Sequence, residues 1–273
     1  MANSVNTNVG ALVALSSLRV TNSELDKTSK RIQTGFRVAD ASDDAAVFAV
    51  AQGIRGNIKA YASVQSSLAA GEGLGQVTAA ALTGISNLVA DVKAKFANLA
   101  DGSLTSAQRT TYQNDAYQLI GQINNFINQA TYNGKNLLNS AATISFVSDV
   151  SGSSLTLQTG TNLLTSVTAL SDAIGAFTAA ADYSTAMGAL TTFEGFVNSI
   201  SAQVAAQSRS LSLQRSFVND LVDATKTGLG ALVDADVAAE SAALQSLQVR
   251  QQLGVQALSI ANQQPNTLLS LFR

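Results

Sequence analysis

The chain contains a single proline, Pro265, which stands close to the end of its 273 residues. Proline removes a backbone donor and clashes with the preceding helical turn, so its absence before position 265 leaves long helices uninterrupted. Hydrophobic residues make up 46% of the chain, whereas aromatic residues make up 5% and tryptophan is absent. Such a chain buries many small side chains, which favours close packing between helices over a thick globular core.

A hydrophobic repeat of eleven residues lies in the N-terminal half of the chain. Its positions are Leu74, Val77, Ala81, Ile85, Leu88, Val92, Phe96 and Leu99. Eleven residues over three turns correspond to about 3.67 residues per turn, which predicts a straight or slightly right-handed helical packing. We therefore expect one long helix over residues 44–100. Gly71, Gly73 and Gly75 indicate a bend or a close helix crossing within it.

The residues before this long helix are predicted to form a helix of their own. Residues 9–32 have a heptad pattern, and Gly35 interrupts it. The heptad positions are Leu15, Leu18, Asn22, Leu25, Ser29 and Ile32. Ser42 is expected to be the N-cap of the long helix. Asp43 and Asp44 would then lie in its first turn, where the positive end of the helix dipole favours acids.

The centre of the chain changes from a helical to a strand pattern. A third helix is predicted over residues 105–130, and the Asn133-Gly134 pair after it is a strong turn signal. The hydrophobic period then falls to two on either side of a Ser-Gly turn, which predicts a small β-hairpin. The alternating residues are Ile144, Phe146, Leu155 and Leu157.

Helices return after the hairpin. Residues 159–182, rich in Ser, Thr and Ala, are expected to form a loop with one short helix, and two further helices are expected over residues 183–226 and 232–262. A chain that runs out and back in this way brings its two ends together. The predicted fold is therefore mainly α: a long antiparallel helical bundle or coiled coil formed by both chain ends, with a small central β-hairpin.

Cysteine and histidine are both absent, and the net charge is −2. Disulfides, zinc sites of the Cys₂His₂ type and catalytic triads built on histidine are therefore excluded. The absence of cysteine suits either a reducing cytosol or a chain that is exported unfolded through a narrow channel. Nothing in the charge balance draws the chain to nucleic acid or to anionic lipid.

Signals for membranes and cofactors are also missing from the sequence. No window approaches the roughly 18 apolar residues of a membrane span, and no signal peptide is visible. The glycine-rich run at residues 71–75 departs from the dinucleotide-binding pattern, because Gln76 stands where that pattern has glycine. Asp40, Asp43 and Asp44 are interpreted as helix-capping residues rather than as a cation site. We expect no catalytic residue, no metal and no cofactor.

The C-terminal helix carries apolar residues on more than one face. Val249, Leu253 and Ile260 lie on a different face from a second set, which consists of Leu244, Leu247 and Leu258. One partner helix cannot cover both faces, so we expect burial against another subunit. The alternative is the ordinary core of a monomeric bundle.

Five motifs in the chain, taken in order, resemble those of bacterial flagellins. They are VNTN at residues 5–8, RIQTGFRV at 31–38, SDDAA at 42–46, YNGKNLL at 132–138 and QQLGVQALSIANQQPNTLLSLFR at 251–273. The chain looks most similar to the short flagellins of alphaproteobacteria. The resemblance implies that residues 1–42 and 232–273 form the two halves of an inner coiled-coil domain. It also implies that 43–138 and 183–231 form the helices of a rod domain, with the hairpin and loop at 139–182.

The resemblance implies a structural subunit that assembles into the helical extracellular filament used for swimming, through a heterologous contact that does not close. The alternative within the same axial family is a hook–filament junction protein, which would cap the polymer rather than extend it. A coiled-coil signalling or receptor domain would need a membrane span or an adaptor site, and an enzyme would need an active site.

The resemblance also implies partners and a route. The partners are other copies of this chain, alone or mixed with other flagellins, together with hook-associated and cap proteins and a cytosolic export chaperone. Export would use the flagellar secretion apparatus without a cleaved signal peptide. Binding to nucleic acid and insertion into a membrane are not expected.

The predicted polymerisation interface consists of apolar residues at both chain ends. They are Val5, Val9, Leu12, Leu15, Leu18, Leu25, Ile32, Val233, Val237, Leu244, Leu247, Leu253, Leu258, Ile260, Leu268, Leu269, Leu271 and Phe272. Asp236 and Glu240 share a helix face at i, i+4 and repel each other, so a cation from another helix or subunit is expected beside them. Arg31 and Arg37 are the candidates, because the resemblance implies that both chain ends meet.

The central excursion contains candidate glycosylation sites, although ordinary loop polarity explains the same composition. The candidates are Ser151, Ser153, Thr161, Thr165, Ser166 and Thr168. One family feature does not carry over to this chain. Many flagellins have an Arg-x-Arg-Glu-Leu run that the vertebrate innate receptor reads, whereas the matching residues 91–95 here are DVKAK.

Overall fold

The computed structural model describes residues 7–176, 179 and 182–270, and it describes their side chains as far as Gln263. The chain divides into two compact units. Residues 57–223 form the central unit, and residues 1–56 together with 224–273 form the terminal unit. The helices are α1 (Val9–Thr34), α2 (Ala45–Leu99), α3 (Ser106–Gln129), α4 (Leu163–Gly175), α5 (Tyr183–Val233) and α6 (Val237–Ser270). The strands are β1 (Thr131–Tyr132), β2 (Lys135–Asn136), β3 (Thr143–Val147) and β4 (Ser154–Gln158).

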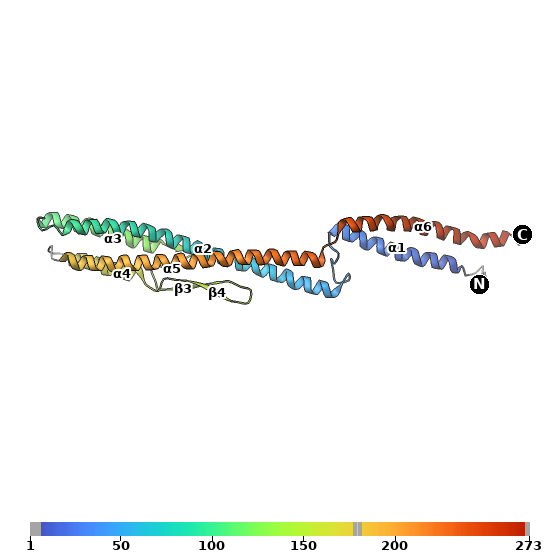
Figure 1. The fold of residues 1–273 in the computed structure, drawn as a ribbon, viewed down its shortest axis with the longest axis horizontal. Helices are drawn as coiled ribbons and strands as arrows, with labels where there is room; N and C mark the ends of the chain where they lie inside the picture. The colour runs from blue at the N-terminus through green and yellow to red at the C-terminus, as the bar shows by residue number, and fades with distance from the viewer. Residues whose placement is uncertain (1–6, 177–178, 180–181, 271–273) are drawn as a thin grey trace. The chain divides into compact units, whose positions relative to one another are not determined.

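In the terminal unit, α1 and α6, from opposite ends of the chain, pack side by side as an antiparallel pair, which we call the α1–α6 hairpin (Figure 1). Three hydrogen bonds trace the antiparallel register, because their α6 partners fall in number as their α1 partners rise. They join Asn8 to Ala261 at 2.6 Å, Asn22 to Gln251 at 2.8 Å and Arg31 to Glu240 at 3.0 Å. The expected pairing of the two chain ends is therefore confirmed.

Gly35 and Asp44 set the end of α1 and the start of α2. Gly35 has a φ of 72°, in the left-handed region that glycine enters without steric cost. The Asp44 carboxylate accepts the backbone N–H groups two and three residues later, which makes Asp44 the N-cap of α2. The prediction of Ser42 as the cap is wrong. Ser42 lies two residues too early, and its hydroxyl donates to Asp40 instead.

A short antiparallel bridge joins the connector after α1 to the connector after α5. It pairs Phe36 with Asp234. Two backbone hydrogen bonds flank it: Arg37 N–H donates to Val233 O at 2.7 Å, and Ala235 N–H donates to Gly35 O at 2.9 Å. The two segments that lead into and out of the α1–α6 hairpin are therefore held to each other by backbone as well as by side chains.

The central unit buries most of the large apolar residues. One cluster is shared by α2, α3, α4 and the first half of α5, and Phe96 and Phe193 are its largest buried side chains. Six of the eight positions of the eleven-residue repeat on α2 lie in or against this cluster, and Leu74 lies in a second one. Leu74, Ile85, Val92, Phe96 and Leu99 are buried, and the other three positions of the repeat are half-buried. The period of the repeat matches a helix that continues without a break over 55 residues.

The three glycines of α2 lie where other parts of the central unit come close. A methyl group on Gly73 would meet the Tyr132 ring at 2.8 Å, and one on Gly71 would meet Phe146 at 3.1 Å. Ser208 of α5 lies over Gly75. Of the two sequence-based interpretations, a close crossing is therefore observed, because a larger side chain at these positions would push the neighbouring elements away.

Two small antiparallel hairpins follow α3. Asn133 and Gly134 both have positive φ, 48° and 71°, which is the geometry of a tight two-residue turn between β1 and β2. The predicted second hairpin is confirmed as β3–β4, with Ile144 opposite Leu157 and Phe146 opposite Leu155. These four residues face a second apolar cluster that α2 and α5 complete.

Side chains of the long helices hold the β3–β4 hairpin in place. Ser67 of α2 accepts the backbone N–H of Val147, and Gln207 of α5 accepts that of Gln158, both at 3.0 Å. Gln214 Nε2 donates to Ser148 O at 2.9 Å. The hairpin is thus bonded to a helix along each of its two edges.

Four predictions for the second half of the chain differ from the structure. The segment predicted as mostly loop contains α4, 13 residues long, because Leu163, Val167, Leu170 and Ile174 form one buried face among the serines and threonines. Helix α5 continues past residue 226 to Val233, and α6 begins at Val237 rather than at 232. Helix α6 also runs on through Pro265 to Ser270, past the predicted end at residue 262.

Candidate interaction surface

Some residues of the predicted polymerisation interface lie in the seam between α1 and α6 of the same subunit. Leu247 is buried, with 7% of its surface exposed, and Leu244 and Leu258 on α6 are half-buried. On α1, the heptad residues Leu15, Leu18, Leu25 and Ile32 are all half-buried. Heptad spacing places these side chains along the seam between two helices, so within one subunit they pack on the opposite helix of the same chain.

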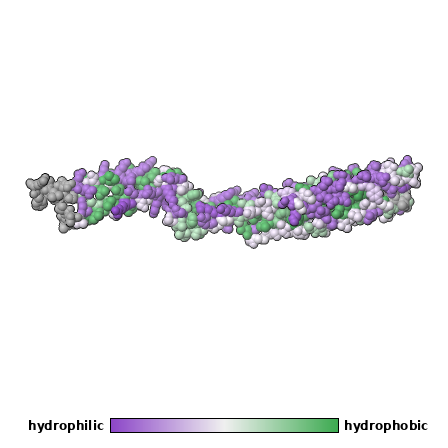
Figure 2. Space-filling model, turned by 180° about the vertical axis from the view of Figure 1, so that it is seen from behind, coloured by the Kyte–Doolittle hydropathy of each residue, from purple (hydrophilic) through white to green (hydrophobic). Residues whose placement is uncertain are grey.

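The sides of α1 and α6 that point away from their seam, together called the outer face, are apolar and uncovered. Seven large hydrophobic residues there are each more than half exposed: Val9, Leu12, Val13 and Val20 on α1, and Val249, Leu253 and Ile260 on α6. Val255, also more than half exposed, lies on the flank of α6 between this face and the seam. Figure 2 shows hydrophobic residues at the surface of this part of the molecule, among hydrophilic ones. The predicted division of α6 into two apolar faces is observed, because Val249, Leu253 and Ile260 are exposed while Leu247 is buried.

The structure places none of the other residues of the predicted polymerisation interface in the seam or on the outer face. Val233 is buried, with 2% exposure, and its carbonyl accepts from the connector after α1, whereas Val237 is 48% exposed. Val5, Leu271 and Phe272 lie outside the described residues. Leu268 and Leu269 belong to the helix α6, but their side chains are outside the described part. The sequence reasoning missed Val13 and Val20, which their spacing of four and eleven residues from Val9 could have placed on the same helix face.

The four charged residues predicted for the interface form one ion pair, one hydrogen bond to a backbone carbonyl and one helix cap. Arg31 forms an ion pair with Glu240, with Nη1 and Oε1 3.0 Å apart. Arg37 donates to the carbonyl of Leu232 at 2.6 Å. Asp236 is the N-cap of α6, since its carboxylate accepts the backbone N–H groups two and three residues later. The backbone N–H groups at the start of α6 stabilise the Asp236 carboxylate, so it needs no cation. Of the two acids, only Glu240 has an arginine partner.

Lys30 joins α1 to the connector that leads into α2, a contact that the sequence reasoning missed. Its Nζ lies 2.5 Å from Asp40 and 3.4 Å from Asp43. The hydrogen bond from Lys30 holds the pKa of Asp40 well below its usual range, and the backbone N–H of Ala39 lowers the pKa of Asp43. Two of the three carboxylates considered as a cation site, Asp40 and Asp43, therefore neutralise a lysine. Within the described residues, no group of three or more acids could hold a metal ion.

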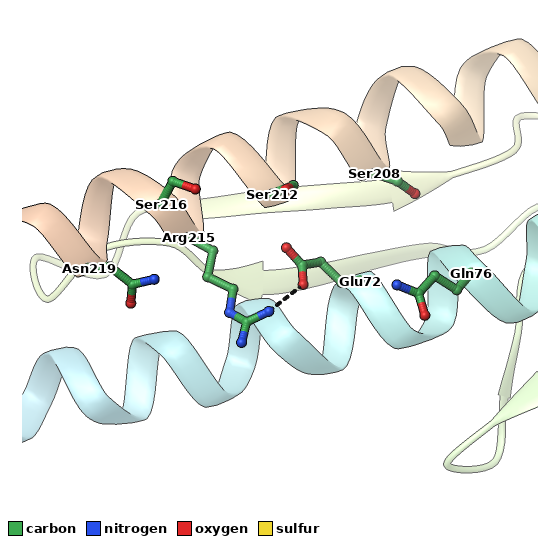
Figure 3. A pocket seen from close by; sticks show the side chains of 7 residues that line it. All are labelled: Glu72, Gln76, Ser208, Ser212, Arg215, Ser216 and Asn219. Carbon is green, nitrogen blue, oxygen red and sulfur yellow. Dashed lines mark hydrogen bonds and ion pairs between the residues drawn. The ribbon is translucent and has the colours of Figure 1, made fainter.

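A polar pocket of about 250 Å³ lies between α2 and α5 in the central unit (Figure 3). Its charges are Arg215 and Glu72, which form an ion pair at 2.7 Å. Ser208, Ser212 and Ser216 line its α5 side. Because the two charges neutralise each other, the pocket offers a ligand no charge of its own.

The candidate glycosylation sites have different exposures. Ser151 and Ser153 are exposed in the turn between β3 and β4. Thr165 and Thr168 are exposed on α4, whereas Thr161 and Ser166 are half-buried. Four of the six candidates are therefore exposed, two in the turn and two on α4.

Comparison with known proteins accounts for both ends of the chain. The model of the bacterial flagellin N-terminal helical region matches residues 5–143, and that of the bacterial flagellin C-terminal helical region matches residues 184–272. The chain belongs to the bacterial flagellin family. Flagellin FljK of Caulobacter vibrioides is 38% identical over 272 residues, which cover 99% of each chain. A flagellin of Brucella melitensis is also 38% identical, over 282 residues and 99% of each chain. The similarity to flagellins of this length shows the short type.

A solved structure described as a flagellar hook-associated protein from Vibrio parahaemolyticus has the same fold. Its TM-score is 0.57, and the match covers 70% of this chain and 100% of that one. At 15% identity this likeness shows the fold alone. The close relatives are flagellins, so the hook–filament junction alternative is not favoured, and this flagellin is a structural subunit of the extracellular filament. None of its described helices is long and apolar enough to span a membrane.

Proposed function

We propose that this flagellin polymerises through the outer face of its α1–α6 hairpin. The observation that supports the proposal is an uncovered apolar surface on both helices, opposite the seam that joins them. A buried apolar side chain contributes about 1.5–3 kcal/mol. Covering seven such residues against neighbouring subunits would therefore outweigh the entropy lost when a subunit is fixed in a filament.

The contact is heterologous in this proposal. The outer face of one hairpin packs on a different surface of its neighbour, so the contact repeats without closing and produces a filament. In the same proposal the chain is a structural component and not a catalyst. The Arg31–Glu240 pair holds the two helices in register, and the sequence prediction adds Leu268, Leu269, Leu271 and Phe272 to the polymer contact.

The finer features of the family belong to the proposal as well. We infer that hook-associated and cap proteins contact the two ends of the polymer and that a cytosolic export chaperone covers the apolar ends before export. Export would proceed without a cleaved signal peptide. A chain without cysteine suits this route, because no disulfide can form before the chain is threaded through a channel.

The test is a double substitution on the outer face, Leu12→Ser with Ile260→Ser. Both side chains are more than half exposed, so the free subunit should keep its helical content and melting temperature. Filaments should be absent by electron microscopy at concentrations where the unaltered chain assembles. The matched control is Val150→Ser. Val150 is an exposed valine in the β3–β4 turn, away from helices α1 and α6. Assembly of the double variant at the unaltered critical concentration would exclude this face as the polymer contact.

A further inference from the structure

The turn between β1 and β2 places a chemically reactive pair of residues at the surface of the central unit. Asn133 and Gly134 are the two central residues of this turn, and both are exposed. They are also the sole Asn-Gly pair in the sequence. The turn lies outside the α1–α6 hairpin, so its chemistry does not depend on the proposed polymer contact.

An asparagine that precedes a glycine can react with its own backbone. Hydroxide removes the proton of the following peptide N–H, and the nitrogen attacks the side-chain Cγ to close a five-membered succinimide ring. The side-chain nitrogen takes up a proton from water and leaves as ammonia. Water then opens the ring at either carbonyl and produces aspartate or isoaspartate, in which the backbone runs through the former side chain. Glycine favours the attack because no Cβ stands beside the attacking nitrogen.

The two reacting groups of this turn are restrained by backbone conformation alone. Among the residues that the structure describes, neither the Asn133 side chain nor the Gly134 N–H makes a hydrogen bond. Both residues have positive φ, and Asn133 is the one described residue other than glycine that does. A tight turn of this kind has little freedom to rotate, so ring closure requires the turn to open first.

The β1–β2 hairpin is small enough to open locally. Each strand has two residues, and the register pairs Thr131 with Asn136 and Tyr132 with Lys135. So short a two-stranded sheet depends on its neighbours for stability. Tyr132 provides one such contact, because its ring lies over Gly73 of α2 while 38% of its surface is exposed. Opening this unit costs far less than unfolding the whole chain.

Asparagines that precede serine are the next most reactive kind, and the described ones are protected by their surroundings. Asn22 and Asn198 lie inside α1 and α5, where the following N–H is held in a helical hydrogen bond. Asn139 and Ser140 follow the hairpin, and both are half-buried. Exposure and a glycine neighbour thus coincide at Asn133.

An Asp-Gly pair can form the same ring, and this chain has one at Asp101 and Gly102. The Asp101 carboxylate accepts the backbone N–H of Ser103 at 2.8 Å, and this bond holds the pKa of Asp101 below its usual range. An ionised carboxylate resists attack by a nucleophile. The neutral amide of Asn133 has no such protection.

We propose that Asn133 is the site at which this flagellin ages chemically: its side-chain amide reacts with the Gly134 nitrogen when the β1–β2 turn opens, and aspartate and isoaspartate form. Each product adds one negative charge. Isoaspartate also adds one atom to the backbone of a two-residue turn, which removes the geometry that sets the register of β1 and β2. Tyr132 then loses its place over Gly73.

The first experiment follows the reaction in the full chain, kept below its critical concentration in mildly alkaline buffer. Digestion under acidic conditions and tandem mass spectrometry should locate the first gain of one mass unit at Asn133. An isoaspartyl methyltransferase should transfer methyl groups to the aged chain, and the rate should rise with pH because hydroxide removes the N–H proton. The matched control is Asn133→Gly, which accepts positive φ and lacks the reacting amide. It should take up no methyl group above the level of fresh protein.

The second experiment tests whether the turn controls the rate. Tyr132→Ala removes the contact with Gly73 and should speed the reaction of Asn133 about fivefold, because the turn opens more often. The rate at Asn198, inside α5, should stay the same. In concentrated urea the turn is absent from both proteins, so Asn133 should react equally fast in Tyr132→Ala and in the unaltered chain.

The consequence for the turn is measured with trypsin, which cuts after Lys135 in β2. Aged native chain should be cut there faster than fresh chain or aged Asn133→Gly, and equal rates would contradict the loss of register. Three further results would overturn the proposal. They are another described asparagine that reacts before Asn133, methyl uptake that persists in Asn133→Gly, and a rate at Asn133 that Tyr132→Ala leaves unchanged.

Discussion

The two leucines on opposite faces of α6 provide the sharpest test of how this flagellin divides its apolar surface. Leu247 is 7% exposed in the seam with α1, whereas Leu253 is 58% exposed on the outer face. Replacing each by alanine removes the same atoms from the same helix. The two substitutions should nevertheless weaken different states of the protein.

The expected magnitudes follow from the exposed fractions. Leu247→Ala removes a buried side chain and should destabilise the α1–α6 hairpin of the free subunit by about 2–5 kcal/mol. Leu253→Ala removes surface that becomes buried only against a neighbour. About half to two thirds of a full burial energy is then lost per subunit, or about 1–2 kcal/mol. That loss corresponds to a critical concentration raised about 5- to 30-fold.

Two measurements separate these outcomes. Hydrogen exchange of α6 amides in the free subunit should speed up in Leu247→Ala and remain unchanged in Leu253→Ala. Sedimentation of filaments from solutions of known concentration should show the raised critical concentration in Leu253→Ala. The reasoning is refuted if Leu253→Ala loosens α6 in the free subunit, or if the unaltered free subunit shows no exchange protection in α6 at all.

Three further predictions follow. Deletion of residues 268–273 should leave the melting of the free subunit nearly unchanged and should raise the critical concentration, and normal assembly would show that the tip is not an axial contact. Because the pKa values of Asp40 and Asp43 are lowered in the folded chain, the stability that these acids contribute is present above about pH 4 and is lost as the pH falls further. Asp40→Asn with Asp43→Asn should therefore lose less stability between pH 5 and pH 2 than the unaltered chain, and equal losses would contradict this. Peptide mapping of native filaments should find any sugar on the four exposed candidates, Ser151, Ser153, Thr165 and Thr168, and unmodified peptides across residues 140–192 would remove the hypothesis.

The helices and the second hairpin could be predicted because each follows a repeating pattern along the chain. The eleven-residue repeat of α2 and the alternation around Ile144 and Leu155 are properties of consecutive residues, and one sequence displays them fully. Helix α4 was underestimated because its four buried residues are embedded among serines and threonines, whose helix propensity is low. The N-cap of α2 was misplaced because serine and two aspartates, all good caps, stand in a row.

The candidate surface could be predicted only in part. Periodicity separated Leu253 from Leu247, because opposite faces of a helix are a matter of spacing. It could not show that Lys30 pairs with Asp40, since that contact depends on the path of a loop around Gly35. It also could not show that Asp236 acts as a cap while Glu240 takes the arginine. Pairings between side chains on separate elements need the three-dimensional register, which no single sequence contains.

The bonds along the edges of the β3–β4 hairpin have a consequence for a protein whose copies are packed closely in a polymer. An isolated two-stranded sheet leaves N–H and C=O groups pointing sideways, and these can template a strand from another molecule. Here one outward amide on each edge, that of Val147 and that of Gln158, is already bonded to a helix side chain. An incoming strand would have to displace Ser67 or Gln207 before it could pair. Crowded subunits are thus steered away from amyloid-like stacking.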